Sequence, residues 1–167
     1  MLILVTLALT LNTIYMKLAE ALSRRSALEE KIDELKTRLG NNVKVQEGDT
    51  PFEDPCELIK ELDRVLEEFH RIVFRINLTN TRSVFEGRTL TDMLAERDML
   101  KKKTRILSDT ISLLTDRGNR YSRNEIKYVA TVDPSELRKI YDATSSQLRR
   151  LDLRIQAIGW EADLVEP

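Results

Sequence analysis

The stretch that decides the fold is residues 54–76, DPCELIKELDRVLEEFHRIVFRI. Its apolar residues recur at alternating steps of four and three: Leu58, Leu62, Val65, Phe69, Ile72 and Ile76. Side chains spaced in this way lie on one face of an α-helix, because the helix completes a turn in 3.6 residues. The stretch therefore predicts a long amphipathic helix whose apolar seam packs against another helix, as in a coiled coil.

Three further segments show the same apolar spacing. The first carries Leu28, Ile32, Leu35 and Leu39. The third carries Leu90, Met93, Leu94, Leu100, Leu107, Ile111 and Leu114, and the fourth Leu137, Ile140, Tyr141, Leu148, Leu151, Ile155 and Ile158. With 5 Gly, 4 Pro and 5% aromatic residues, the chain is poor in residues that favour turns and strands. We predict an all-α fold: a four-helix bundle of two antiparallel hairpins, with one domain over residues 16–160 and a tail over 161–167.

The expected helix ends carry recognisable signals. Asp54 and Asp133 each precede a proline, and an N-cap carboxylate followed by proline at the first helical position is a typical helix start. Thr89 before residues 90–92 is a weaker version of this signal. For the other ends, we expect left-handed caps at three glycines, Gly40, Gly118 and Gly159.

A weak internal repeat relates the two halves of the chain. A shift of 79 residues places DPCEL at 54–58 on DPSEL at 133–137, and it also aligns Leu28 with Leu107 and Ile32 with Ile111. Gene duplication explains this similarity, but so does the independent recurrence of the same cap and the same heptads. Both explanations imply two helical hairpins.

The opening residues, MLILVTLALTLNTIY at 1–15, do not match the hairpin pattern. A secretory signal needs a basic N-terminal region and a small-residue cleavage site, and a membrane-spanning helix needs about 20 apolar residues. Residues 1–15 contain no Lys or Arg, and Lys17 ends the apolar run early. We interpret them as an extension outside the domain, with Met16 as the natural start. A weak membrane or signal segment and a packed helical turn are the alternatives.

Composition limits the classes of partner and of chemistry. The net charge of −1 does not favour nucleic-acid binding, which normally shows a basic excess. The single cysteine, Cys56, allows no disulfide within the chain and fits a reducing compartment, so we expect a cytoplasmic protein. Cys56 and the single histidine, His70, lie fourteen residues apart on one expected helix, too far to act together. Glu67 and His70 have a metal-ligand spacing, but it occurs once and faces outward. We expect no catalytic residues, no metal and no cofactor.

Two polar loops differ in charge. Residues 40–53 are mainly acidic, whereas residues 118–132 contain Arg120, Tyr121, Arg123 and Lys127, a mixture of cations and an aromatic that is typical of anion sites. These four residues are our candidate anion-binding site. Alternatively, the acidic loop neutralises them, within the bundle or between subunits. Residues 43–45 and 126–132 are rich in β-formers, so we expect a small β-ribbon in these connecting loops.

Several motifs together resemble a known family. They are MKLAEAL at 16–22, KVQEGD at 44–49, EDP at 53–55, RINLTN at 75–80, GRTLTDMLAERD at 87–98, RYSRNEIK at 120–127 and RIQAIGW at 154–160. This set is similar to septicolysin-like proteins, small bacterial proteins without an established activity. The resemblance implies a start at Met16, and the family label implies a cytolysin. No stretch after Lys17 is apolar enough to enter lipid, so the residues do not favour that activity.

We expect a self-associating structural or interaction protein rather than an enzyme. Long helices with narrow apolar stripes bury them most completely by pairing with further copies, and symmetric homo-oligomers are the usual outcome. Two other functions stay open: a module that binds an anion, a nucleotide or a nucleic acid through residues 118–128, and a membrane-active protein. Of the partners, a second copy of the chain is favoured, a small anionic ligand stays open, and nucleic acid and membrane are disfavoured.

Overall fold

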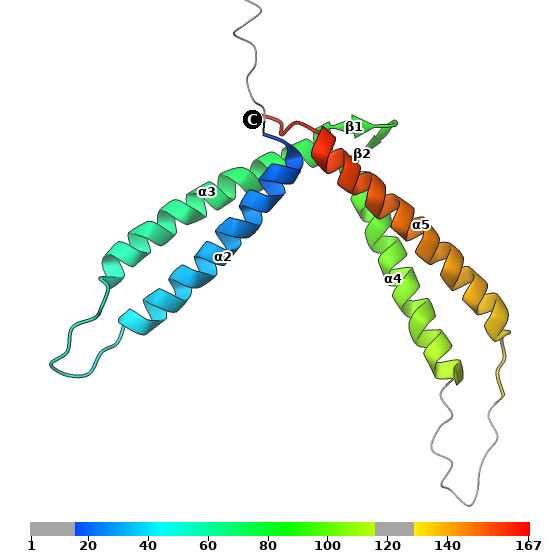
Figure 1. The fold of residues 1–167 in the computed structure, drawn as a ribbon, viewed down its shortest axis with the longest axis horizontal. Coiled ribbons are helices and arrows are strands. Elements are labelled where there is room, and N and C mark those ends of the chain that lie inside the picture. The colour runs from blue at the N-terminus through cyan, green and yellow to red at the C-terminus, as the bar shows by residue number, and fades with distance from the viewer. Residues whose placement is uncertain (1–15, 116–128) are drawn as a thin grey trace, which may run out of the picture. The chain divides into compact units, whose positions relative to one another are not determined.

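The computed structural model describes residues 16–115 and 129–167 of the chain. Helices α2 (Leu18–Asn42), α3 (Pro55–Arg82), α4 (Leu90–Thr115) and α5 (Pro134–Glu161) make up most of it (Figure 1). The strands β1 (Val84–Phe85) and β2 (Arg88–Thr89) form a small antiparallel hairpin between α3 and α4. The prediction of an all-α fold is confirmed. Contacts divide the chain into two compact units: unit 1 runs to Ser83 and also includes Ile158–Pro167, and unit 2 is Val84–Ala157.

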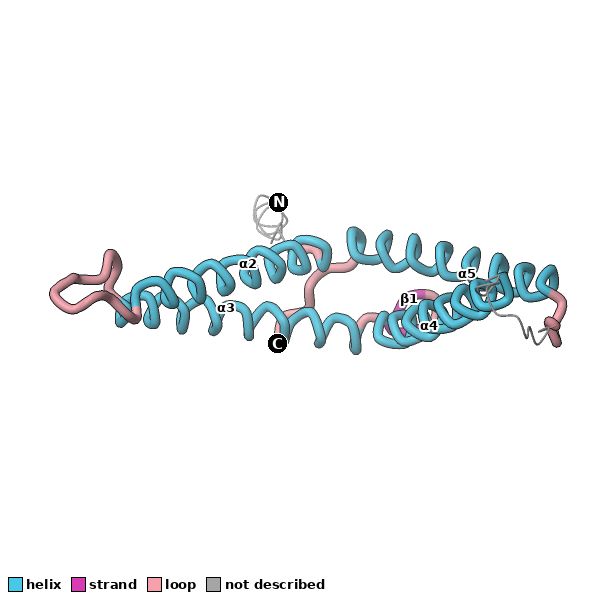
Figure 2. Tube along the Cα trace, turned by 90° about the horizontal axis from the view of Figure 1, so that it is seen from below, coloured by secondary structure: helices cyan, strands magenta, loops and turns pink. Residues whose placement is uncertain are grey.

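In unit 1, helices α2 and α3 lie antiparallel and side by side (Figures 1 and 2). The seam predicted from the sequence faces the helix contact, since Leu35, Leu58, Ile72 and Ile76 are buried. Ion pairs flank this seam on the helix surfaces, linking α2 to α3 through Arg24–Glu68, Lys31–Glu61 and Arg38–Glu61. Apolar packing and paired charges therefore join the same two helices.

The loop end of this hairpin is closed by Asn42 and Arg38. The Asn42 side chain donates to the Arg38 carbonyl at 2.9 Å and accepts from the Glu53 backbone N–H at 2.9 Å. Arg38 also pairs with the Glu53 carboxylate. The helix consequently continues two residues beyond Gly40, so the left-handed cap predicted there is wrong: the last turn is held by the Val43 N–H, which donates to the Leu39 carbonyl.

The opposite end of unit 1 is closed by a segment that we call the terminal clasp, residues 162–165. The Leu18 N–H donates to the Ala162 carbonyl at 2.9 Å, and the Leu164 N–H donates to the Met16 carbonyl at 2.8 Å. Residues 161–167 were expected to be a tail, but Ala162 and Leu164 belong to the buried core. Gly159 lies inside α5 and is buried against Ala19, so it does not act as the predicted helix cap.

Unit 2 contains the β-hairpin, α4 and most of α5. Its buried residues include Leu90, Met93 and Leu100 on α4 and Thr144 on α5. The two helices are linked by a hydrogen bond from the Gln147 amide to Glu96 at 3.2 Å. A second link runs from Arg154 on α5 to Glu86 in the β-hairpin turn at 2.8 Å.

The predicted helix starts are confirmed. The Asp54 carboxylate accepts from the Cys56 N–H at 2.8 Å, and the Asp133 carboxylate accepts from the Ser135 N–H at 2.8 Å. The Ser135 hydroxyl donates to Asp133 as well, and these two hydrogen bonds lower the pKa of Asp133 because they favour its charged form. At α4 the Thr89 hydroxyl accepts from the Asp92 N–H at 3.2 Å, which fits a weaker cap.

A β-ribbon exists, but not where the loop sequences place it. Residues 43–45 form no strand, and residues 126–128 lie outside the described residues. The observed ribbon pairs Val84 with Thr89, across a turn in which Glu86 and Gly87 have φ of 53° and 79°. Two successive positive φ angles match the right-handed twist of a two-residue hairpin. The loop at 43–53 has no two successive positive φ angles. The β-ribbon predicted in the connecting loops is therefore confirmed, but it lies between α3 and α4 and not at 43–45.

Candidate functional site

The candidate anion-binding residues cannot be placed. Arg120, Tyr121, Arg123 and Lys127 lie outside the described residues, as does Gly118. Their pairing with the acidic loop and their affinity for an anion therefore stay predictions. The acidic loop itself is described, and one of its carboxylates, Glu53, already has a partner in Arg38, which lowers the pKa of Glu53 by hydrogen bonding and charge.

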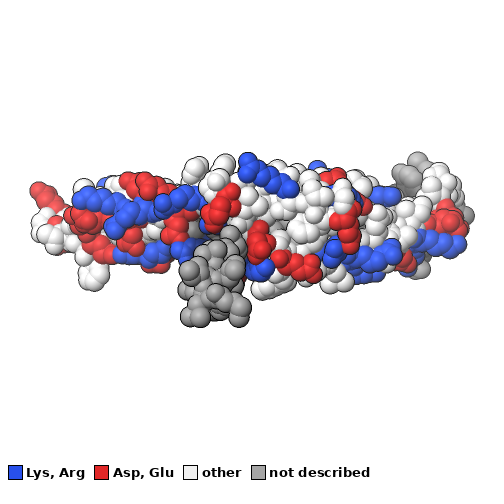
Figure 3. Space-filling view, turned by 90° about the horizontal axis from the view of Figure 1, so that it is seen from above, with Lys and Arg blue, Asp and Glu red and all other residues white. Residues whose placement is uncertain are grey.

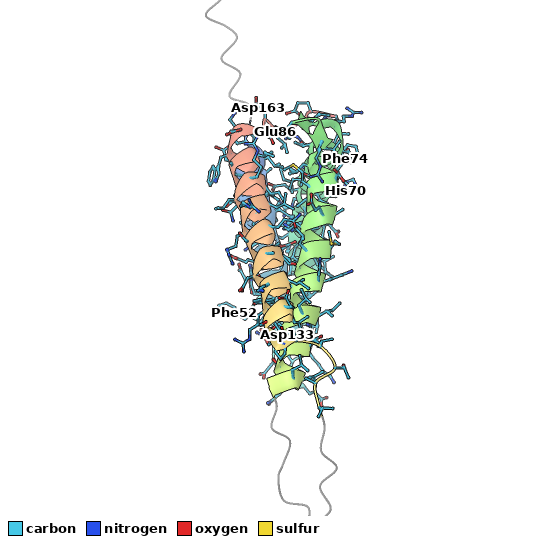
Figure 4. All side chains as sticks on the ribbon, turned by 90° about the vertical axis from the view of Figure 1, so that its right-hand side faces the viewer. Phe52, His70, Phe74, Glu86, Asp133 and Asp163 are labelled. Carbon is cyan, nitrogen blue, oxygen red and sulfur yellow. The ribbon has the colours of Figure 1, made fainter. Side chains whose placement is uncertain are left out.

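The residues singled out on α3 occupy its surface. Cys56 is exposed in the first turn, and Glu67 and His70 are exposed farther along the helix. Fourteen residues of helix separate Cys56 from His70 by about 21 Å. Figure 4 shows His70 and Phe74 in the half of the hairpin nearer to Asp163, with Phe52 at the other end. The structure confirms the outward position of Glu67 and His70 and does not bring Cys56 and His70 together.

A hollow of about 510 Å³ lies beside α3 in unit 1. Met16, Phe74 and Pro167 supply apolar surface, and arginines and carboxylates stand around it. Two of these arginines are already neutralised, because Arg24 pairs with Glu68 and Arg75 with Glu166. The hollow is therefore mostly apolar, with few charges left to recognise a ligand.

Helix α4 carries a second apolar seam on its outer surface, which we call the α4 outer seam: Met99, Ile106 and Leu113. These residues follow one another at intervals of seven, and their exposed fractions are 51%, 64% and 76%. A step of seven residues is two helical turns, so the three side chains form one line along the helix. The line lies away from the buried face of α4, which carries Leu90, Met93 and Leu100. A shallow hollow of about 530 Å³ runs beside Met99 and Ile106.

Sequence reasoning missed this seam, although the signal was present. In the third segment, the apolar spacing marked the line that includes the buried Leu90, Met93 and Leu100. The outer seam has the same heptad spacing, but large apolar residues fill only one of the two seam positions in each heptad. The other position holds Ala95, Lys102 and Asp109. Only the exposed fractions separate the two seams, since both have helical spacing.

Helix α3 has a related but less exposed outer seam. Ile59 and Leu66 are 46% and 42% exposed, and Val73, seven residues farther on, is half-buried. Asp63 and His70 alternate with them. Both units therefore show apolar surface that their own helices do not cover.

The α4 outer seam carries charges of both signs beside its apolar residues. Acidic and basic side chains are interspersed on the face that Figure 3 shows, and many of them form ion pairs. At the start of α4, for example, Arg88 binds Asp92 and Glu96, and these contacts raise the pKa of Arg88. Lys102 and Asp109, like many other surface charges, form no ion pair with any residue in 16–115 or 129–167. The seam thus combines exposed apolar side chains with charges of both signs that have no ion pair in the described part of the chain.

No membrane-spanning helix and no metal-binding cluster of acidic, cysteine and histidine residues occurs in the described part of the chain. The fold and these surfaces define the class: an all-helical protein of two antiparallel hairpins with apolar outer faces. The comparisons add the family. The chain belongs to a family that is described as a "Family of unknown function (DUF6847)", whose model matches residues 25–164.

A solved structure supports this assignment. The chain is similar to a protein from Corynebacterium diphtheriae that is described as a functionally unknown conserved protein, with 44% sequence identity and a TM-score of 0.84. The similarity covers 90% of this chain and 99% of that one. No curated protein matches the chain.

The resemblance to septicolysin-like proteins is wrong. The matching family model is of unknown function, and neither it nor the structural neighbour points to a septicolysin. Several of the short motifs that suggested it, such as RINLTN at 75–80, lie within the residues that the model of this family matches. They therefore give no reason to expect a cytolysin.

Proposed function

We propose that this protein acts as a self-associating structural or interaction protein, not as an enzyme, and that it works in the cytoplasm. The observation that carries the proposal is the α4 outer seam, in which Met99, Ile106 and Leu113 are each more than half exposed at heptad spacing. Single exposed apolar residues are common on protein surfaces and need no explanation. A line of them along a helix is different, because a second helix can cover all three at once.

The driving force is burial of this apolar surface. Fourteen residues separate Met99 from Leu113, so the seam is about 21 Å long. Each square ångström of apolar surface removed from water contributes roughly 25 cal/mol, and helices with heptad spacing pair along such lines. The outer seam of α3, with Ile59 and Leu66, adds a second surface of the same kind. The single exposed cysteine supports the reducing compartment.

Mass as a function of concentration tests the proposal. In sedimentation equilibrium of the full chain, we expect the mean mass to rise above 19.4 kDa as the protein concentration increases. The melting temperature should rise in parallel, because association stabilises the folded state by mass action. A mass of 19.4 kDa throughout, up to about 1 mM, would overturn the proposal.

A matched pair of variants shows which surface carries the association. Ile106→Asp places a charge in the middle of the α4 outer seam and should return the protein to a monomer. Ile140→Asp changes an exposed residue of α5, at 47% exposure, whose neighbours seven positions away, Asp133 and Gln147, are polar, and should leave association unchanged. Association that survives Ile106→Asp would mean that another surface than the α4 outer seam joins the copies.

A further inference from the structure

We infer that the α4 outer seam pairs with the same seam of a second copy, antiparallel and around a two-fold axis at Ile106. This inference rests on the self-association proposed above and specifies its partner and its geometry. A two-fold contact is self-complementary, so a seam that meets its own copy must match itself in both shape and charge. The residues of α4 meet both requirements.

The apolar residues match under this symmetry. Met99 lies seven residues before Ile106, and Leu113 lies seven residues after it. In an antiparallel pair centred on Ile106, Met99 therefore lies opposite the second copy's Leu113, and Leu113 lies opposite its Met99. All three exposed residues of the seam are covered, and each is covered by an apolar side chain.

The charged residues match as well. Lys102 lies four residues before Ile106, and Asp109 lies three residues after it. In the antiparallel pair, position 103 lies opposite the second copy's Asp109. Lys102 is one residue from that position, a difference of about 1.5 Å along the helix axis. The symmetry repeats this pair, so one contact contains two ion pairs. Both groups are available, since neither has an ion pair in residues 16–115 or 129–167.

A parallel arrangement is disfavoured by the same two residues. In a parallel pair, Lys102 would lie beside the second copy's Lys102, and Asp109 beside its Asp109. Like charges at short range are destabilising, and proteins commonly use such repulsion to exclude a wrong orientation. The charges of α4 therefore select the direction of pairing, while the apolar residues supply the attraction.

The α3 outer seam has the same spacing but is a weaker candidate. Its third apolar residue, Val73, is half-buried within unit 1, and Ile59 and Leu66 are less exposed than the α4 residues. The area that one face of α4 can bury is small compared with the roughly 800 Å² per partner of a stable interface. We therefore expect a reversible α4 dimer whose formation depends on the protein concentration.

Cysteine cross-linking tests the geometry directly. In a Cys56→Ser background, Ile106→Cys should form a disulfide-linked dimer on mild oxidation, because the axis brings the two copies of this position together. Met99→Cys alone and Leu113→Cys alone should not cross-link, whereas an equimolar mixture of these two variants should. Leu66→Cys and Leu153→Cys serve as controls on α3 and α5. Self-linking of Met99→Cys would show a parallel pair, and self-linking only of Leu66→Cys would show an α3 contact; both results overturn the inference.

Charge reversal tests the selection of direction. Lys102→Glu and Asp109→Lys should each weaken dimerisation by about tenfold at low salt, because each leaves like charges opposed in two places. The double variant K102E/D109K should restore the affinity. Equal affinity for the wild type and both single variants would overturn the role of these charges and with it the inference.

The outcomes separate this inference from the proposed function. A wild-type protein that remains monomeric contradicts self-association itself. A wild-type protein that associates, but shows neither the Ile106→Cys dimer nor the effect of charge reversal, contradicts only the α4 geometry and leaves self-association in place.

Discussion

In unit 1, helices α2 and α3 are joined along their length by buried leucines and isoleucines and by cross-helix ion pairs, and both ends of the hairpin are closed. In unit 2, α4 and α5 share the same type of apolar spacing, but the links between the two helices that the structure describes are few. The Gln147–Glu96 hydrogen bond is one of them. The α4 outer seam, with exposed fractions of 51%, 64% and 76%, also belongs to unit 2.

The difference shows that apolar spacing alone does not decide how fully a helix hairpin is packed. Unit 1 has two closures: the Asn42–Glu53 contact at its loop and the terminal clasp at its other end. Unit 2 has the Arg154–Glu86 ion pair at its β-hairpin end, and residues 116–128 of its loop lie outside the described residues. Each closure fixes the chain at a hairpin end, where helices otherwise fray. Self-association through α4 would compensate for this difference, because a second copy would cover the unit with the more exposed seam.

The largest effect is expected from breaking the terminal clasp. Leu164→Ala removes a side chain of which 1% is exposed and leaves a cavity, so the unfolding free energy should fall by about 3 kcal/mol. Leu153→Ala, in the exposed surface of α5, is the matched control and should change it by less than about 0.5 kcal/mol. Urea denaturation followed by circular dichroism measures both. Equal losses would mean that the clasp does not stabilise unit 1.

A smaller effect is expected at Thr79, which ties the clasp to α3. Its buried hydroxyl donates to the Arg75 carbonyl at 2.8 Å and accepts from the Val165 N–H at 2.9 Å. Thr79→Val keeps the shape but leaves that N–H without its partner, so we expect a loss of about 1–2 kcal/mol. Hydrogen exchange of the Val165 amide should accelerate.

Thr81→Val is the control for this substitution. The Thr81 hydroxyl is exposed and donates only to carbonyls of its own helix, at 3.0 Å from Asn77 and Leu78. Its removal should hardly change stability, and it should leave the Val165 amide unaffected. If the two variants behave alike, the hydrogen bond across the clasp contributes nothing.

The smallest effect is expected when the pH is lowered and Glu53, at the loop end of unit 1, becomes protonated. Arg38 lowers the pKa of Glu53, first through a side-chain hydrogen bond and then through its charge. A lowered pKa in the folded state stabilises the protein above the ordinary pKa of the carboxyl and stops doing so as the pH falls through the folded value. The melting temperature should therefore decline in this acid range.

Two variants isolate the contribution of this ion pair. Arg38→Gln should flatten the acid decline of the melting temperature, measured from pH 6 to pH 3, because Glu53 then titrates as in the unfolded chain. Arg64→Gln, which removes an exposed arginine bonded to the Lys60 carbonyl of its own helix, should leave the decline unchanged. An unaltered decline in Arg38→Gln would assign it to other carboxylates.

Much of the local structure could be predicted from the sequence. The caps at Asp54 and Asp133 and the buried positions of Leu58 and Ile72 follow from residue type and spacing, because helix geometry depends on near neighbours in the chain. The positions of Gly40 and Gly159 could not be read correctly. A glycine ends a helix only where the chain must turn away, and at both sites contacts with distant residues keep the helix going.

The sequence by itself determined the four helices of the described residues and the starting caps at Asp54 and Asp133, and it contains the spacing of both apolar faces of α4. The tertiary structure alone decided which of those faces is covered, and it showed that Leu164 belongs to the core against residues almost 150 positions earlier. The physical reason is that helical periodicity follows from hydrogen bonds four residues apart. Burial, in contrast, depends on which distant segment comes to lie against each face, and the spacing of apolar residues carries no record of that partner.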